Sequence, residues 1–311
     1  MPHSHHSHSG QFCKHASGRL EDVVLEAIRQ GFEVYGLTEH APRYRIEDMY
    51  PEEAGLDADA LMKQFEDFLD EAHRLKAVYA PQITLLVGLE TEYISEKDLD
   101  EMDALLGRFG DRVEYIVGSI HHVRTVPIDF DIPMYDKALA LFASKDSAQD
   151  PHCLLFLDYF DAQYALMQRF KPEIIGHFDL CRLFAPQYVF SDHPAVWEKV
   201  IRNIRYAVGY GALFEVNAAA FRKKWNTAYP GEEVLKAILN EGGRLAFSDD
   251  SHGPHAVGLN YNRMAEYLKS LEVSEVWHLQ ASQTPNRGNR RTQSMRLAGD
   301  WSEHPFWGQR V

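Results

Sequence analysis

The 311-residue sequence has little cysteine and no long apolar run. Its three cysteines, Cys13, Cys153 and Cys181, cannot all pair and show no close Cys-x-x-Cys spacing, which argues against a disulfide framework. The longest apolar stretches, such as 83–87 and 115–117, fall far short of the roughly twenty residues that span a bilayer. The N-terminus also lacks the basic start and apolar run of a secretory signal. We therefore expect a cytoplasmic protein with reduced thiols and no membrane span.

Basic side chains are also in short supply. The chain has 32 Lys and Arg against 46 Asp and Glu, a net charge of -14. Such a surface repels nucleic-acid phosphates, so we expect no nucleic-acid partner. One basic region stands out, because five arginines lie between Arg287 and Arg310 against only Asp300 and Glu303. We interpret residues 284–311 as a solvated C-terminal tail, partly ordered at best, rather than as a nucleic-acid-binding arm.

Two common catalytic motifs are missing. The sequence has neither a Ser-centred nucleophile elbow nor a G-x-x-x-x-G-K-[ST] phosphate loop, so serine hydrolases and nucleotide kinases are poor interpretations. Cys13 lies close to His15 and is a possible nucleophile. We favour packing beside a site for this thiol.

Histidine, in contrast, crowds the first fifteen residues. The positions are His3, His5, His6, His8 and His15. An expression tag usually has an unbroken histidine run and a linker, whereas these histidines alternate with serine and lead into a helix signal at 18–22. Side chains alternate along an extended segment, so His6 and His8 point the same way and can grip one ion. We interpret His3 and His5 as flanking residues.

Apolar residues alternate between helical and strand spacing along the chain. Leu20, Val23 and Ala27 recur at helical spacing that stops at Gly31, and a buried strand follows at 32–37. Further strands are predicted at 83–87, 113–119, 173–176, 213–216, 244–247 and 276–279, with helices at 57–79, 99–109, 152–170, 194–210, 232–240 and 261–271. Roughly seven such βα units predict an α/β fold with a closed or nearly closed barrel. We expect one domain over 1–283, with a lid insertion near 123–151, where prolines and aspartates break the rhythm.

Candidate metal ligands fall at or just beyond the carboxyl ends of the predicted strands. They are His40, Glu90, His121, His177, Asp250 and His252. In a βα barrel those ends share one face, so these residues should converge, joined by His6 and His8 if a short first strand ends there. Imidazoles with a few carboxylates suit zinc, iron or manganese better than calcium or magnesium. With His15 the set numbers nine, which is too many ligands for one ion. We therefore expect two or three divalent ions, most of all zinc, and Glu90 could bridge two of them.

Hydrolysis is the chemistry that such a cluster favours. Bound metal ions lower the pKa of water into the neutral range and hold hydroxide in line with a phosphorus or carbonyl centre. A phosphate dianion is bound bidentately by arginine forks. Arg182 and Arg222 follow the same strand ends, and Arg43 lies just beyond His40. We predict that these arginines bind substrate, with a surface salt bridge as the alternative for each.

Seven motifs resemble those of the polymerase and histidinol phosphatase (PHP) superfamily of metal-dependent phosphoesterases, in the family's order. They are HSHS at 6–9, CKHA at 13–16, GLTEHA at 36–41, GLE at 88–90, GSIHH at 118–122, GHFD at 176–179 and SDDSH at 248–252. Within the superfamily the sequence is most similar to the histidinol-phosphate phosphatases of fungi and bacteria. The resemblance implies a distorted (β/α)7 barrel, a three-metal centre and hydrolysis of L-histidinol phosphate to L-histidinol and phosphate in histidine biosynthesis.

The last motif departs from the family's usual Ser-Asp-Ala-His, because Asp249 precedes Asp250 here. Alignment on Asp-x-His makes Asp250 the ligand. We also predict that Asp250 and His252 act catalytically, by helping the leaving alkoxide to gain a proton. Candidate acceptors for the histidinol ammonium group are Asp129, Asp131 and Asp179, and the alternative is a solvated acidic lid.

Two other functions stay open. The chain could be another PHP phosphoesterase that acts on a different small phosphate or on a nucleotide, although the acidic surface argues against an exonuclease. It could also be a non-catalytic metal-binding protein, for which we would expect ligands clustered in sequence rather than spread over strand ends. The oligomeric state stays open as well.

Overall fold

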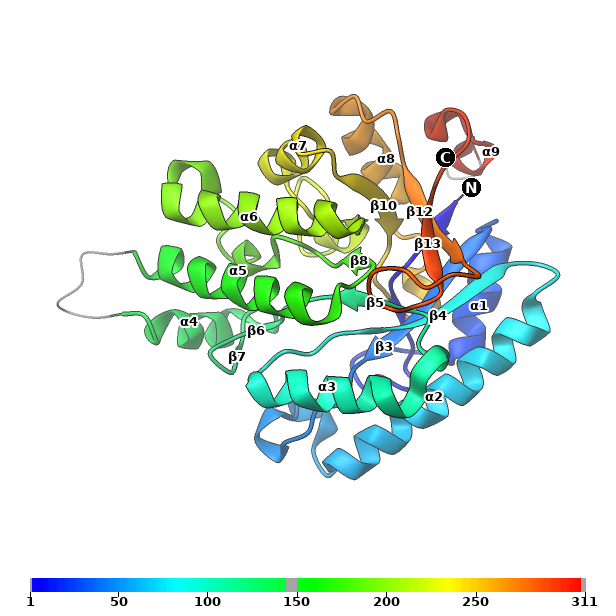
Figure 1. Ribbon diagram of the computed structural model, residues 1–311, viewed down its shortest axis with the longest axis horizontal. Coiled ribbons are helices and arrows are strands. Elements are labelled where there is room, and N and C mark those ends of the chain that lie inside the picture. Colours follow the sequence, from blue (N-terminus) through cyan, green and yellow to red (C-terminus); the bar gives the residue numbers. More distant parts are fainter. Residues whose placement is uncertain (1, 144–149, 309–311) are drawn as a thin grey trace.

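Seven parallel strands curl into a barrel in the computed structural model, which describes residues 2–143 and 150–308 (Figure 1). In sheet order the strands are β1 (His3–Ser4), β3 (Val34–His40), β4 (Thr84–Glu90), β5 (Tyr115–Gly118), β8 (Ile174–Ile175), β9 (Leu213–Asn217) and β10 (Arg244–Ser248). The first strand also packs against β10, so the sheet is nearly closed. The predicted α/β barrel is confirmed.

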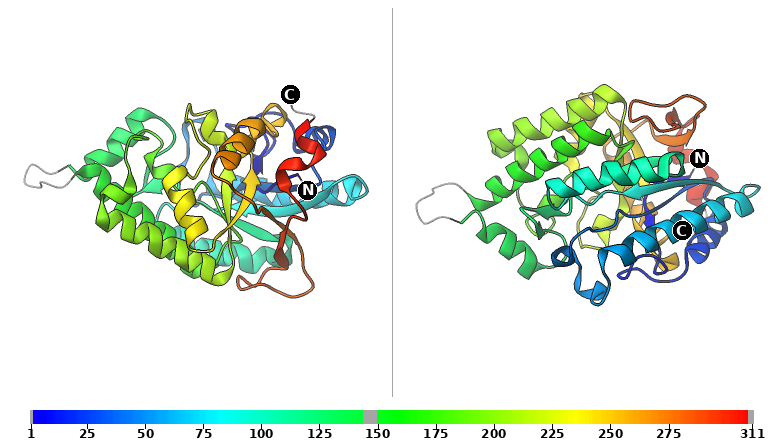
Figure 2. Two further views of the ribbon diagram at one scale, coloured as in Figure 1. Left: turned by 90° about the horizontal axis from the view of Figure 1, so that it is seen from above. Right: turned by 60° about the horizontal axis from the view of Figure 1, so that its bottom comes forward.

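Helices cover the outside of this barrel (Figures 1 and 2). They are α1 (Leu20–Arg29), α2 (Ala58–Tyr79), α3 (Glu96–Phe109), α4 (Ile132–Ala140), α5 (Pro151–Phe170), α6 (Pro194–Tyr210), α7 (Glu232–Asn240), α8 (Tyr261–Ser270) and α9 (Pro305–Gly308). The helix α2 shows why they form: Asp57 caps its first turn by accepting from Ala60 N at 2.8 Å. Its apolar face, with Phe65 and Phe68, is buried. No helix within the described ranges is long and apolar enough to cross a membrane.

A hairpin closes the amino-terminal end of the barrel. It consists of β12 (Trp277–Ala281) and β13 (Thr292–Arg296), which pair antiparallel. Leu279 joins the small apolar cluster inside the barrel, to which the strands contribute residues such as Val34, Leu86 and Ile174. The strand predicted at 276–279 therefore exists, but it is not a further parallel βα unit. The seventh place in the sheet belongs to β1.

The expectation of a loosely ordered C-terminal tail is wrong for residues 284–308. Arg290 is buried and its Nε donates to Glu173 at 2.8 Å, so this arginine is neutralised rather than solvated. Trp301 and Phe306 are buried in the main apolar core. Residues 309–311, which include Arg310, lie outside the described residues.

The predicted insertion near 123–151 has regular structure of its own. A short hairpin of β6 (His122–Val123) and β7 (Val126–Pro127) is followed by α4. Residues 144–149 lie outside the described part of the chain. In both figures α4 lies far from the two marked chain ends, which are close to each other.

Candidate metal centre

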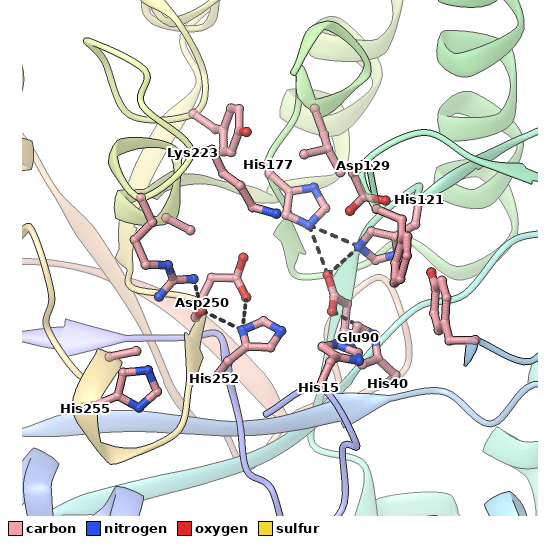
Figure 3. Close-up of a pocket in the computed structure, with 17 residues that line it drawn as sticks. His15, His40, Glu90, His121, Asp129, His177, Lys223, Asp250, His252 and His255 are labelled. Carbon is pink, nitrogen blue, oxygen red and sulfur yellow. Dashed lines mark hydrogen bonds and ion pairs between the residues drawn. The ribbon is translucent and has the colours of Figure 1, made fainter. Parts of the chain in front are cut away.

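All nine predicted ligands gather at the carboxyl end of the barrel. Seven of them line one cavity of about 380 Å³ (Figure 3): His15, His40, Glu90, His121, His177, Asp250 and His252. The other two, His6 and His8, are fully buried beside it. Their Nε2 atoms lie 3.1 and 3.3 Å from Glu90 Oε2. The convergence expected from strand ends therefore occurs in the structure.

Strand pairing explains this convergence. His40 and Glu90 are the last residues of β3 and β4 and are register partners. The strand β2 (Ser7–His8) pairs in parallel with β11 (Ser251–His252), which sets His8 opposite His252. Between β10 and β11, Asp250 adopts a positive φ of 47°, a strained conformation for a non-glycine residue. The turn at Asp250 leads the chain into β11 alongside β2, so that His8 and His252 come from adjacent short strands.

The two carboxylate oxygens of Glu90 face two different groups of imidazoles. Oε1 lies 3.1 Å from His177 Nε2 and 3.2 Å from His121 Nε2. Oε2 lies 3.1 Å from both His6 Nε2 and His40 Nδ1. Burial favours a higher pKa for Glu90, but the surrounding imidazoles outweigh it and hold this pKa well below its ordinary value. An ionised carboxylate in this position is able to bridge two metal ions.

The donor atoms fit divalent metal ions. Groups of three ligand atoms within 4.8 Å of one another include His8/His40/His252, His6/His8/Glu90 and His6/His177/Asp250. Several buried imidazole nitrogens, among them His6 Nε2 and His8 Nε2, have no hydrogen-bond partner among the described residues. Such orphans are costly in a folded protein, and metal coordination would satisfy them. Burial and the neighbouring His40 lower the pKa of His15 to about 3, which favours the neutral imidazole that binds metals.

Three buried carboxylates surround the ligands and were not predicted from the sequence. Glu215 Oε1 lies 2.8 Å from His6 Nδ1, and Glu39 Oε2 lies 3.4 Å from His8 Nδ1. Glu92 Oε1 lies 3.0 Å from His40 Nδ1. Carboxylates behind metal-binding imidazoles fix the tautomer and the ring orientation. Glu39 and Glu92 could have been predicted from the sequence, because Glu39 directly precedes the predicted ligand His40 and Glu92 lies two residues after the predicted ligand Glu90.

Of the three arginines predicted to bind substrate, only Arg222 lines the cavity. Its Nη2 donates to the carbonyl of Asp250 at 2.7 Å. Arg182 is 5% exposed and pairs with Asp179 and Glu233. Arg43 is buried and pairs with Glu53. Direct substrate contact by Arg182 and Arg43 conflicts with these positions, because carboxylates outside the cavity already occupy both guanidinium groups.

The flanking histidines serve the fold. His3 Nε2 accepts from Phe247 N at 2.9 Å, and His5 Nε2 accepts from Leu279 N at 3.0 Å. Burial lowers the pKa of His5 to about 3, so the ring is neutral and can accept this hydrogen bond. Both side chains therefore point into the barrel rather than into the cavity.

Asp249 and Cys13 also lie near the ligands, and the contacts of both indicate a structural role. Asp249 is fully buried and accepts from Ser4 Oγ at 2.9 Å and Gly258 N at 2.7 Å, so it holds the turn that presents Asp250. Cys13 Sγ lies 3.2 Å from His15 Nε2. Burial raises the pKa of the Cys13 thiol well above its ordinary value, which argues against a nucleophilic thiolate.

Other residues that line the cavity include several outside the predicted site. They are Tyr50, Phe130, Lys223, Tyr229 and His255, and Asp129, a predicted acceptor for the histidinol ammonium group, lines the cavity as well. Figure 3 shows Lys223 and His255 on one side of the cavity and Asp129 and His121 on the other. The cavity thus has the Lys223 ammonium group on one side and the Asp129 carboxylate on the other.

A family model described as PHP domain matches residues 4–219. The chain belongs to the PHP family. It is 48% identical to the "Probable histidinol-phosphatase" of Schizosaccharomyces pombe, over 89% of this chain and 89% of the relative. It is 31% identical to the histidinol-phosphatase of Saccharomyces cerevisiae, over 98% of this chain and 99% of the relative.

Two solved structures share the PHP barrel. One, from Listeria monocytogenes, matches with a TM-score of 0.72 at 22% identity and covers 84% of this chain and 98% of its own. The other is a histidinol phosphate phosphatase from Lactococcus lactis in complex with zinc, L-histidinol and phosphate. It matches with a TM-score of 0.57 at 18% identity, over 86% of this chain and 93% of its own. At these identities the two structures show the fold.

Proposed function

We propose that this chain is a cytoplasmic, metal-dependent histidinol-phosphatase, which hydrolyses L-histidinol phosphate to L-histidinol and phosphate in histidine biosynthesis. The main support is the meeting of nine imidazole and carboxylate ligands at one cavity. The family and the names of the two fungal relatives point to the same reaction.

The donor set supports two or three divalent ions, with zinc as the first choice and iron or manganese as alternatives. Zinc is also the metal in the Lactococcus lactis complex. We propose that the nine ligands hold these ions, with Glu90 between the two groups of imidazoles. Bound divalent ions lower the pKa of water and offset the charge of a phosphate ester.

Positive side chains complete the proposed phosphate site. Arg222 donates from Nη2 to the Asp250 carbonyl at 2.7 Å and from Nη1 to the Asp249 carbonyl at 3.5 Å, and it keeps its other N–H groups for a ligand. Lys223 lines the same cavity and forms no ion pair with any described residue. We propose that both bind the phosphate dianion and stabilise the charge that develops during its transfer. Arg182 and Arg43 then contribute by holding the surrounding segments in place.

Proton delivery to the leaving alkoxide is assigned to the last motif. His252 lines the cavity, and its Nδ1 lies 3.0 Å from the carbonyl oxygen of Asp250. We propose that Asp250 and His252 help to hold or move that proton. A side chain that coordinates a metal ion is a poor proton donor. We therefore expect one of Asp250 and His252 to act mainly as a metal ligand and the other to hold or move the proton.

A phosphate-release panel tests this function. We expect the metal-loaded chain to release phosphate from L-histidinol phosphate and to stop when a chelator is added. His177→Ala should abolish turnover, whereas His304→Ala, far from the cavity on the approach to α9, should keep it. Release only from other phosphate esters would instead favour a different PHP phosphoesterase. Release from no phosphate ester at full metal loading would favour a non-catalytic metal-binding protein.

A further inference from the structure

Two aromatic rings from separate loops form a stacked pair at the cavity. Tyr50 comes from the loop between β3 and α2, and Phe130 from the loop between β7 and α4. Their ring centroids are 5.7 Å apart with planes 11° from parallel, and both residues line the cavity. Phe130 is 39% exposed. An exposed aromatic ring beside a polar metal-binding cavity is available to a ligand that has a planar or cationic group.

The position of Tyr50 is fixed from behind. The guanidinium of Arg43 lies 4.7 Å from the Tyr50 ring centroid. Arg43 is itself buried and held by Glu53, and the backbone N–H of Tyr50 donates to the same Glu53 at 2.9 Å. The aromatic pair is therefore preorganised on one side, which lowers the entropy cost of binding a ring.

Asp129 is the acidic residue beside this pair that has no partner. It lines the cavity and forms no ion pair or hydrogen bond with any described residue. The other two acids considered from the sequence are occupied: Asp131 accepts from Met134 N at 2.8 Å as the cap of α4, and Asp179 pairs with Arg182. A partly buried carboxylate without a partner favours a cationic ligand.

The substrate of the proposed reaction has groups in a matching order. In L-histidinol phosphate the ammonium is on the carbon next to the ester carbon, and the imidazole ring is one carbon further out. With phosphate at Arg222 and Lys223, the ammonium has to lie close to the metal ligands and the ring further away. In Figure 3 Asp129 lies on the same side of the cavity as His121, and the backbone N–H of the preceding residue, Ile128, donates to the His121 carbonyl at 2.9 Å.

We propose that Asp129 binds the substrate ammonium group and that the Tyr50–Phe130 pair holds the imidazole ring. This inference rests on the proposed histidinol-phosphatase function. It makes these three residues the determinants that separate histidinol phosphate from other small phosphate esters.

Three substrates separate the two contacts in the full-length, metal-loaded enzyme. They are L-histidinol phosphate, its deamino analogue, which keeps the ring, and O-phosphoethanolamine, which keeps the ammonium but has no ring. For Asp129→Asn we expect kcat/KM for histidinol phosphate to fall about 10- to 100-fold, mainly through KM, because a charge-assisted hydrogen bond is lost. The loss for the deamino analogue should be much smaller.

Phe130→Leu should show the complementary pattern. The expected loss is about 2- to 10-fold for the two substrates with a ring, and smaller for O-phosphoethanolamine. Asp131→Asn is the matched control in the same loop, since asparagine also caps helices and Asp131 does not line the cavity. Thermal unfolding and metal content of each variant should match those of the parent chain.

The outcomes are distinct. Equal losses on histidinol phosphate and its deamino analogue in Asp129→Asn, or a similar loss in Asp131→Asn, would overturn the ammonium assignment. Equal losses on all three substrates in Phe130→Leu would overturn the ring assignment. If the parent chain releases no phosphate from histidinol phosphate, the proposed function itself fails, independently of any variant.

Discussion

Glu92 illustrates how much of the centre depends on residues that touch no substrate. Its carboxylate is buried, 3.0 Å from His40 Nδ1 and 3.5 Å from His121 Nδ1. Burial favours a higher pKa for Glu92, but His121 and His40 outweigh it and hold this pKa well below its ordinary value. The charge of Glu92 therefore persists at neutral pH, in a position to orient the rings of His40 and His121, two of the proposed metal ligands.

For Glu92→Gln we expect metal affinity to fall about 10- to 100-fold while the fold is kept, because the charge behind His40 and His121 is lost. Competition with a chromogenic chelator measures this directly. Glu241→Gln is the control, since Glu241 pairs with Arg205 and does not line the cavity. Retention of metal equal to the parent chain would refute an orienting role for Glu92.

Arg182 is buried in a network with Asp179 and Glu233, and its guanidinium stacks 4.4 Å from the Phe190 ring centroid. Arg182→Met should lower the free energy of unfolding by about 3–5 kcal/mol, because the buried Asp179 and the partly buried Glu233 lose their cationic partner. Denaturant unfolding measures this. The exposed pair of Arg205 with Glu241 gives the control, Arg205→Met, with an expected cost of about 0–1 kcal/mol. Parent-like stability with a raised KM would instead restore Arg182 as a substrate ligand.

At the level of single residues, the sequence predicts the metal ligands better than it predicts which side chains pair with the arginines around them. His40, Glu90 and His177 follow apolar runs, and barrel topology alone brings such positions together. The partners of Arg182 and Arg43 depend on side-chain directions and on segments distant in sequence. No spacing rule separates a free arginine near a strand end from one already paired.

Among the elements, strands in apolar runs were predictable, including the two-residue β8 (Ile174–Ile175) within the strand predicted at 173–176, whereas the polar two-residue strands were not. The strands β3, β4, β9 and β10 lie where apolar runs predict them. β1, β2 and β11 are too short to show a period, yet they complete the barrel and align two ligand motifs. The hairpin of β12 and β13 was also missed, because an isolated strand pattern does not reveal whether its partner is parallel or antiparallel.

The C-terminal segment offers a test at the element scale. Arg290 donates to Glu173 and to the carbonyls of Phe170 and Lys171, all at 2.8 Å. Arg290→Met should cost about 3–5 kcal/mol in the free energy of unfolding, since the buried Glu173 loses its cationic partner and keeps only the neutral donors Asn286 Nδ2 and Ile116 N. The neighbouring Arg291→Met, whose side chain is 57% exposed, should cost less than about 0.5 kcal/mol. Equal, small effects in both variants would support the solvated tail after all.

For the whole molecule, the metal centre is expected to stabilise the barrel as well as to serve catalysis. Its proposed ligands extend from His6 to His252 and come from most of the strands, so ions bound by the folded state oppose unfolding. Chelation should lower the free energy of unfolding by about 2.7 kcal/mol if free metal was present at about 100 times its Kd. Differential scanning calorimetry would show the lower Tm.

His177→Ala is the matched variant for this measurement, because it removes one ligand without changing the strands. Its Tm should respond less to the chelator than that of the parent chain. If chelation leaves the Tm of the parent chain unchanged at full initial loading, the ions do not contribute to folding stability.

The placement of β1 inside the barrel has a consequence for synthesis of the chain. His3 accepts from Phe247, Ser4 bonds to Asp249, and His5 accepts from Leu279. These three residues are therefore translated 244, 245 and 274 residues before their partners. At about 5–20 residues per second, that delay is roughly 15 to 60 s. Throughout this interval His3 and His5 lack these partners, and the proposed metal ligands can all come together only after His252 has been synthesised.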